Sequence, residues 1–107
     1  MSAVLDVNVI RHDPEAVRTM LRDRKYDEDI LNRFLELDRE WRAVVDEGNR
    51  LRKERNEASL RISKLSGEEK AEAVTRMKEV AVRIGQLDAR VAELEAQRDE
   101  VVLLFPN

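Results

Sequence analysis

The chain has 107 residues, which is room for one small domain, and its 23 acidic and 20 basic residues give a net charge of −3. Charged residues make up 40% of the chain and aromatic residues only 4%, a composition typical of long helices in solvent rather than of a thick globular core. The lack of cysteine excludes disulfides, a thiolate nucleophile and a cysteine-based zinc site, and it fits a cytoplasmic protein. The longest apolar run, residues 101–105, is far shorter than the roughly 20 residues that span a bilayer, so we expect no membrane contact.

Residues 1–26 are expected to form an extended segment followed by a short helix. Asp13 can cap the first helical turn, Pro14 suits the first helical position, and Glu15 suits the positive end of a helix. The apolar face of this helix consists of Ala16, Val17, Met20 and Leu21.

Two long helices are expected next, over residues 27–65 and 69–104, with a tip turn at 66–68. In both, apolar residues recur at alternating steps of three and four, which predicts a coiled-coil seam. Gly48 and Arg55 fall on seam positions, so we expect weak packing in the middle of the first helix, whereas Gly67 can adopt a positive φ at the turn. The predicted fold is all-α: one domain, residues 1–107, forming a long antiparallel two-helix coiled-coil hairpin with a short N-terminal helix packed at its base.

Basic side chains are concentrated near the predicted tip. Residues 48–64 hold six basic and two acidic side chains, whereas residues 1–47 hold eight and twelve, and residues 85–107 hold two and five. A polyanion would therefore prefer the outer half of the hairpin, where arginine can bind phosphate through two hydrogen bonds. On charge alone, however, a solvated coiled-coil face without a specific partner is the favoured interpretation.

Three segments, VIRHDPEAVRTMLRDR, LELDREWRAVVDEGNRLRKERNEASLRISKL and VVLLFPN, together resemble the N-terminal domain of seryl-tRNA synthetase. The most specific matches are Leu37, Asp38, Trp41 and Arg42, the NRLRKERN segment through Asn56, and the final Pro106 and Asn107. The resemblance implies an antiparallel arm that binds the long variable arm and elbow of tRNA(Ser) through backbone and shape. The tRNA-binding positions that it implies are Arg50, Arg52, Lys53, Arg55 and Asn56, continued toward the tip by Arg61 and Lys64. Charge and position alone add Arg76, Lys78 and Arg83 on the second helix.

The resemblance also implies that a class II catalytic domain, absent from this chain, activates serine with ATP and transfers it to tRNA. ATP, Mg²⁺ and serine would bind that domain, and no cofactor or metal is expected here. The sequence contains no glycine-rich phosphate loop, Ser/His/Asp set or metal-binding cluster, and His12 stands beside a helix cap without a partner group. We therefore expect a monomeric tRNA-binding domain that is not itself a ligase, from a homodimeric serine-tRNA ligase. Its expected partners are tRNA(Ser) and the catalytic domain of the same polypeptide.

A structural coiled coil that pairs with another protein or with itself is the alternative. Arg55 and Arg98 at the seams could select such a partner by charge. The segregation of basic charge to the outer half favours the RNA-binding hypothesis, because a protein-pairing coil would present mixed or apolar stripes on its outer faces. Nothing in the sequence supports an independent catalyst.

Overall fold

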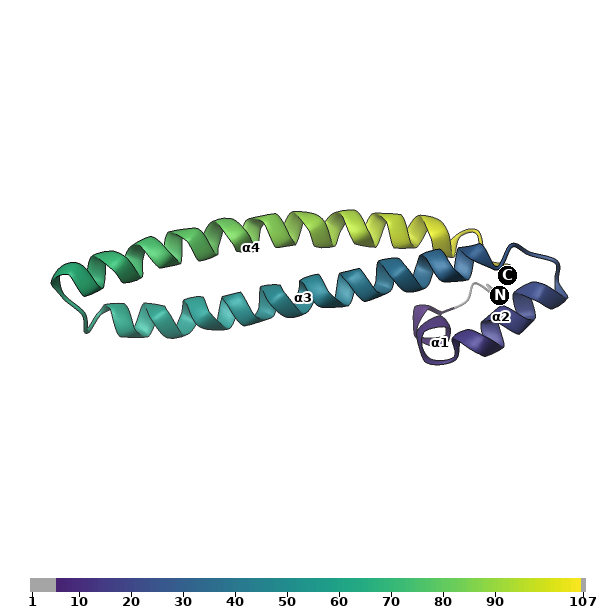
Figure 1. The fold of residues 1–107 in the computed structure, drawn as a ribbon, viewed down its shortest axis with the longest axis horizontal. Coiled ribbons are helices and arrows are strands. Elements are labelled where there is room, and N and C mark those ends of the chain that lie inside the picture. Colours follow the sequence, from purple (N-terminus) through teal and green to yellow (C-terminus); the bar gives the residue numbers. More distant parts are fainter. Residues whose placement is uncertain (1–5, 107) are drawn as a thin grey trace. The chain divides into compact units, whose positions relative to one another are not determined.

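The computed structural model describes residues 6–106, and all the regular secondary structure in this range is helical (Figure 1). Its helices are α1 (Val7–His12), α2 (Pro14–Asp23), α3 (Asp29–Ile62) and α4 (Gly67–Val102). The chain divides into two compact units: unit 1 contains the residues up to Trp41 and those from Glu93 onward, and unit 2 is Arg42–Ala92. The predicted all-α fold, with two long antiparallel helices after short N-terminal helices, is confirmed.

Helix α1 occupies residues for which an extended conformation was expected. The Asp6 carboxylate accepts a hydrogen bond from the backbone N–H of Asn8 at 2.7 Å and so caps the helix. Arg11 and His12 lie in the last turn, where positively charged groups interact favourably with the negative end of the helix dipole. Ile10 is fully buried. The prediction of an extended segment was therefore wrong for residues 7–12, and its first five residues lie outside the described range.

Helix α2 begins as expected, and the residue after its C-cap has an unusual backbone conformation. The Asp13 carboxylate accepts from the backbone N–H of Ala16 at 3.2 Å, and Pro14 is the first helical residue. At the other end, Lys25 has a φ of 61°. The Tyr26 N–H donates to the Leu21 carbonyl at 2.8 Å, which completes a Schellman motif, a helix ending that normally places glycine at the left-handed position.

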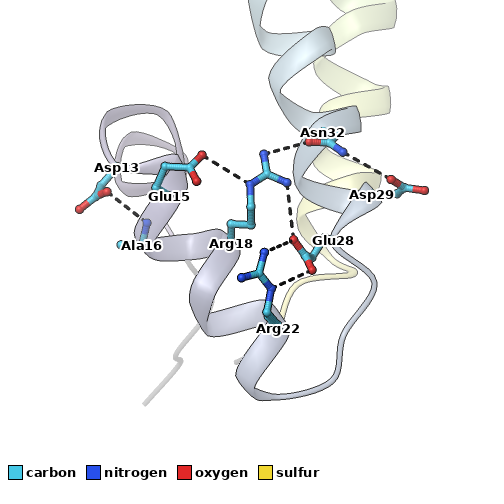
Figure 2. A network of polar contacts seen from close by, with 8 residues as sticks. All are labelled: Asp13, Glu15, Ala16, Arg18, Arg22, Glu28, Asp29 and Asn32. Atoms are coloured by element: carbon cyan, nitrogen blue, oxygen red, sulfur yellow. Dashed lines mark hydrogen bonds and ion pairs between the residues drawn. The ribbon is translucent and has the colours of Figure 1, made fainter.

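Polar contacts connect α2 to the start of α3 (Figure 2). The Arg22 guanidinium donates to both carboxylate oxygens of Glu28, each at 3.1 Å. Arg18 donates to the Asn32 side-chain oxygen at 3.0 Å and lies 3.8 Å from the Glu28 carboxylate. These contacts fix the entry of α3 beside α2 within unit 1.

Unit 1 contains the larger apolar core of the two units. The buried cluster consists of Ile10, Val17, Leu21, Leu31, Phe34, Val101 and Phe105. The rings of Phe34 and Phe105 meet edge to face, with centroids 6.3 Å apart. Since Phe105 follows the end of α4, this aromatic pair joins the C-terminal segment to the start of α3.

In unit 2, α3 and α4 run antiparallel side by side and share a narrow seam (Figure 1). Its buried apolar side chains are Ala58, Val80, Ile84 and Leu87. Residues 63–66 form the turn, and Gly67 has the positive φ, 61°, that the sequence suggested. Gly48 is buried on the seam, and a Cβ at this position would lie 3.2 Å from Nη1 of Arg52, so the Arg52 side chain occupies the space left by the glycine.

Candidate nucleic-acid interface

Charge differs strongly between the two units. Unit 2 contains twelve basic and nine acidic side chains, whereas unit 1 contains eight basic and fourteen acidic ones. A net positive unit therefore occurs in a chain that is acidic overall, and a polyanion would prefer this unit.

All ten residues that the sequence suggested as tRNA-binding positions fall in unit 2. Eight of them are exposed: Arg50, Lys53, Asn56, Arg61, Lys64, Arg76, Lys78 and Arg83. Arg52 and Arg55 are half-buried, and Arg55 occupies a seam position between the helices. Arg55 is therefore less available to a ligand than its place in the NRLRKERN segment suggested.

Three of these arginines form ion pairs across the two helices. Arg83 donates to both oxygens of the Glu47 carboxylate, at 2.9 and 3.1 Å, and Arg76 donates to both oxygens of Glu54, at 3.1 and 3.4 Å. Arg52 pairs with Asp88. The hydrogen bonds from Arg83 lower the pKa of Glu47 below its ordinary value. A phosphate at Arg76 or Arg83 would have to compete with a carboxylate that is already bound.

Five of the other basic residues form no such ion pair within the described chain. Within residues 6–106, no ion pair involves the side chains of Lys53, Arg61, Lys64 or Lys78, and Arg50 has only a longer-range attraction to Glu47. Long exposed cations of this kind can approach phosphate without breaking an interaction within the chain. The ten positions thus fall into two groups that differ in their availability.

A shallow depression of about 300 Å³ lies on α4 and is lined by Ala71, Glu72, Thr75, Arg76 and Glu79. Two glutamates line it, and its one basic residue, Arg76, is paired with Glu54. These carboxylates make the depression unsuitable for a phosphate group.

Asp38, for which the sequence indicated no structural role, is the centre of a buried ionic cluster in unit 1. Asp38 is fully buried, and its carboxylate accepts hydrogen bonds from Arg11 at 2.6 and 2.7 Å and from Arg98 at 3.1 Å. The Arg98 guanidinium also lies 4.6 Å from the centroid of the Trp41 ring, a cation–π contact. Arg98, predicted as a seam residue that could select a partner, therefore pairs within the chain.

The described residues contain no group of His, Asp or Glu side chains arranged to hold a metal ion. None of the four helices has a stretch apolar enough, over sufficient length, to cross a membrane.

The chain is similar in sequence to known proteins over nearly its whole length. Residues 4–107 match the family model described as the seryl-tRNA synthetase N-terminal domain. The chain belongs to this family. The chain is 40% identical over 109 residues to a serine–tRNA ligase of Chlorobium phaeobacteroides, an alignment that covers 97% of the chain and 26% of that relative. It is 37% identical over 108 residues to a serine–tRNA ligase of Pyrococcus horikoshii, covering 97% of the chain and 24% of that relative.

A third relative, a serine–tRNA ligase of Korarchaeum cryptofilum, is 36% identical over 100 residues, covering 94% of the chain and 22% of the relative. The chain therefore spans about a quarter of the length of the ligases that it matches, and the match to the family lies in their N-terminal domain.

Proposed function

We propose that this domain binds tRNA(Ser) through unit 2, on the long variable arm and elbow of the RNA. The observation that carries the proposal is the net positive charge of unit 2 in a member of the seryl-tRNA synthetase N-terminal domain family. RNA helices carry their recognisable features on phosphates and 2′-hydroxyls, which suits a rigid helical surface that reads backbone and shape.

Binding would draw its free energy chiefly from the release of counterions condensed on the RNA. Each phosphate neutralised by a lysine or arginine releases condensed cations, so affinity falls as the salt concentration rises. The acidic surface of unit 1 would repel the RNA and so favour complexes in which unit 2 makes the contact.

We propose that serine activation takes place in the part of the longer ligases that this chain does not span. ATP, Mg²⁺ and serine would bind there, and the domain described here would hold the tRNA in position. Its contribution to catalysis is then substrate orientation and not a reacting group.

The alternative function, a coiled coil that pairs with another protein, has less support. Leu60 and Val82 are the large apolar side chains exposed in unit 2, 74% and 63% accessible. They lie at outward-facing positions of two different helices, so they do not form the continuous stripe that helix pairing requires. Single exposed apolar residues are common on monomeric proteins.

Paired alanine substitutions in the two units test the proposal. The double variant Lys53→Ala, Lys78→Ala removes two exposed cations of unit 2, and Arg33→Ala, Arg39→Ala removes two from unit 1. The first should weaken binding of tRNA(Ser) and reduce the slope of log K against log salt by about one per lost phosphate contact. The second should change neither, and an equal loss in both variants would contradict the assignment to unit 2.

A further inference from the structure

Ion pairs across the helices of unit 2 separate two flanks. Arg83 and Arg76 on α4 pair with Glu47 and Glu54 on α3, whereas Arg52 on α3 pairs with Asp88 on α4. In a coiled coil, seam residues come in pairs spaced three apart. The residue just before the first member of such a pair and the residue just after the second member lie on opposite sides of the helix pair. The seam positions Gly48 and Arg55 are joined by Leu51, three residues after Gly48 and four before Arg55. Glu47 directly precedes Gly48 and Arg52 directly follows Leu51, so the two sets of pairs lie on opposite flanks.

Helical periodicity assigns further residues to each flank, because positions three, four and seven apart share a helix face. The charged flank contains Glu47, Arg50, Glu54, Glu57 and Arg61 on α3 and Glu69, Glu72, Arg76, Glu79, Arg83, Gln86 and Arg90 on α4. The amide flank contains Arg42, Val45, Asn49, Arg52, Asn56 and Ser59 on α3 and Ala71, Val74, Lys78, Ala81, Gly85, Asp88 and Ala92 on α4.

The two flanks differ in carboxylates more than in cations. The charged flank has five basic and six acidic side chains, whereas the amide flank has three basic and one acidic. Asp88, the one carboxylate of the amide flank, pairs with Arg52, so this pair takes up one cation and one carboxylate there. The pairs Arg76–Glu54 and Arg83–Glu47 do the same on the charged flank. Carboxylates outside these pairs therefore remain on the charged flank and not on the amide flank. A phosphate on the charged flank would lie within one helical turn of a glutamate at almost every position, and like charges at that spacing repel.

The amide flank also presents neutral groups suited to an RNA backbone. Asn49, Asn56 and Ser59 are exposed, and an amide both donates to phosphate oxygens and accepts from a 2′-hydroxyl. The Ser59 hydroxyl donates to the Arg55 carbonyl at 3.0 Å, which leaves its oxygen lone pairs available to accept. Exposed Lys78 supplies a cation on the opposite helix.

Gly85 gives an independent indication of close approach. It lies exposed in the interior of α4, where glycine lowers helix stability relative to alanine. A Cβ at this position would meet nothing within 4 Å, so packing within the chain does not require the glycine. A missing side chain on this flank would let a ligand backbone approach the helix closely.

We infer that the amide flank, and not the charged flank, lies against the sugar–phosphate backbone of the RNA. This inference rests on the proposed function and assigns one side of unit 2 to it. Among the ten suggested positions, Arg52, Asn56 and Lys78 then face the RNA. Arg50, Arg61, Arg76 and Arg83 lie on the charged flank, where Arg76 and Arg83 pair the two helices.

Site-specific cross-linking tests this assignment directly, because the chain contains no cysteine. Ala81→Cys places a thiol on the amide flank and Gln86→Cys places one on the charged flank, both at exposed positions of α4. Each variant would be alkylated with an aryl azide and irradiated with tRNA(Ser) after circular dichroism has established equal helicity. Cross-linking from position 81 at least about tenfold above that from position 86 is the expected result.

Each other outcome is informative. Equal cross-linking, cross-linking mainly from position 86, or none from either position while the unmodified chain binds the RNA, overturns the flank assignment and leaves RNA binding intact. If the unmodified chain does not bind tRNA(Ser), the proposed function fails and the flank assignment fails with it.

A steric pair of variants checks the same assignment without a chemical label. Gly85→Gln adds a side chain to the amide flank, and Ala89→Gln adds the same side chain at an exposed position on the outer face of the same helix. The first should weaken binding of tRNA(Ser) several-fold while helicity stays equal or rises, and the second should leave affinity unchanged. Undiminished binding by Gly85→Gln would overturn the close approach at this position.

Discussion

Arg11 donates hydrogen bonds from Nε and Nη2 to both carboxylate oxygens of Asp38, at 2.7 and 2.6 Å, across 27 positions of sequence. The contact joins α1 to α3 within unit 1. Asp38 is fully buried, and this hydrogen bonding raises the pKa of Arg11 above its ordinary value. Together with Arg98, the pair forms a charged cluster that holds three helices in one unit.

Removing the carboxylate of this cluster should destabilise unit 1 strongly. Asp38→Asn leaves Arg11 and Arg98 without their counter-charge in a largely buried position, and breaking a buried ion pair from one side costs about 3 kcal/mol. Urea unfolding followed by the fluorescence of Trp41, the single tryptophan, measures the change. Asp46→Asn, at an exposed position of α3, serves as the control and should have little effect. Equal midpoints for the two variants would contradict the role of the cluster.

The left-handed residue at the end of α2 offers a stabilising substitution. Lys25 has a φ of 61°, a conformation that costs a residue with a Cβ roughly 1 kcal/mol and costs glycine almost nothing. Lys25→Gly should therefore raise the midpoint of thermal unfolding, because Lys25 is exposed and its backbone hydrogen bond to the Arg22 carbonyl is retained. A lower midpoint would show that the lysine side chain stabilises the helix end by more than the backbone strain costs.

Two glycines of the long helices should respond differently to alanine. Gly85→Ala meets nothing within 4 Å and should gain about 1 kcal/mol from helix propensity. Gly48→Ala brings a methyl group to 3.2 Å from the Arg52 guanidinium, which is flexible but paired with Asp88. Its gain should be smaller, because the guanidinium must move. Chemical unfolding of both variants checks the order, and a larger gain from Gly48→Ala would contradict it.

Acid should weaken the ion pairs that join the helices. The pKa of Glu47 is lowered chiefly by hydrogen bonds from Arg83, and the pKa of Glu28 is lowered chiefly by those from Arg22. A carboxylate with a lowered pKa stabilises the folded chain above its unfolded pKa, about 4.3. That stabilisation is lost as pH falls through the lower folded value.

The melting temperature should therefore fall as the solution is acidified below about pH 5. Arg83→Gln removes the partner of Glu47, so this variant should melt lower than the unmodified chain at pH 7, and the difference should shrink toward pH 3. Both effects should decrease in high salt, because the pair is exposed. A difference that stays constant with pH would show that Arg83 stabilises the chain by something other than this carboxylate.

Sequence periodicity predicted the two long helices with ends that differ from those of α3 and α4 by two or three residues. The turn was expected at residues 66–68, whereas residues 63–66 form it, and Gly67 has the expected positive φ as the first residue of α4. Periodicity was insufficient for α1, where a few alternating apolar residues suggested an extended segment and the capping carboxylate of Asp6 was overlooked. The Arg11–Asp38 pair could not be derived from spacing, since it depends on how two helices meet.

The candidate interface shows the same division between local and tertiary information. The charge count located the basic unit, but it gave equal weight to Arg76, which is bound to Glu54, and to Lys78, which has no ion pair within the described chain. Which cations are available depends on the antiparallel register of α3 and α4. Helical spacing becomes informative about flanks only once the ion pairs across the seam are known.

The most direct test of the central claim is a binding titration of the unmodified chain with tRNA(Ser) and with the same tRNA lacking its long variable arm, each at two salt concentrations. The account predicts binding that weakens steeply with salt, as phosphate contacts require, and that is lost or strongly reduced without the variable arm. Equal affinity for the two RNAs, or no measurable binding to either, would contradict it.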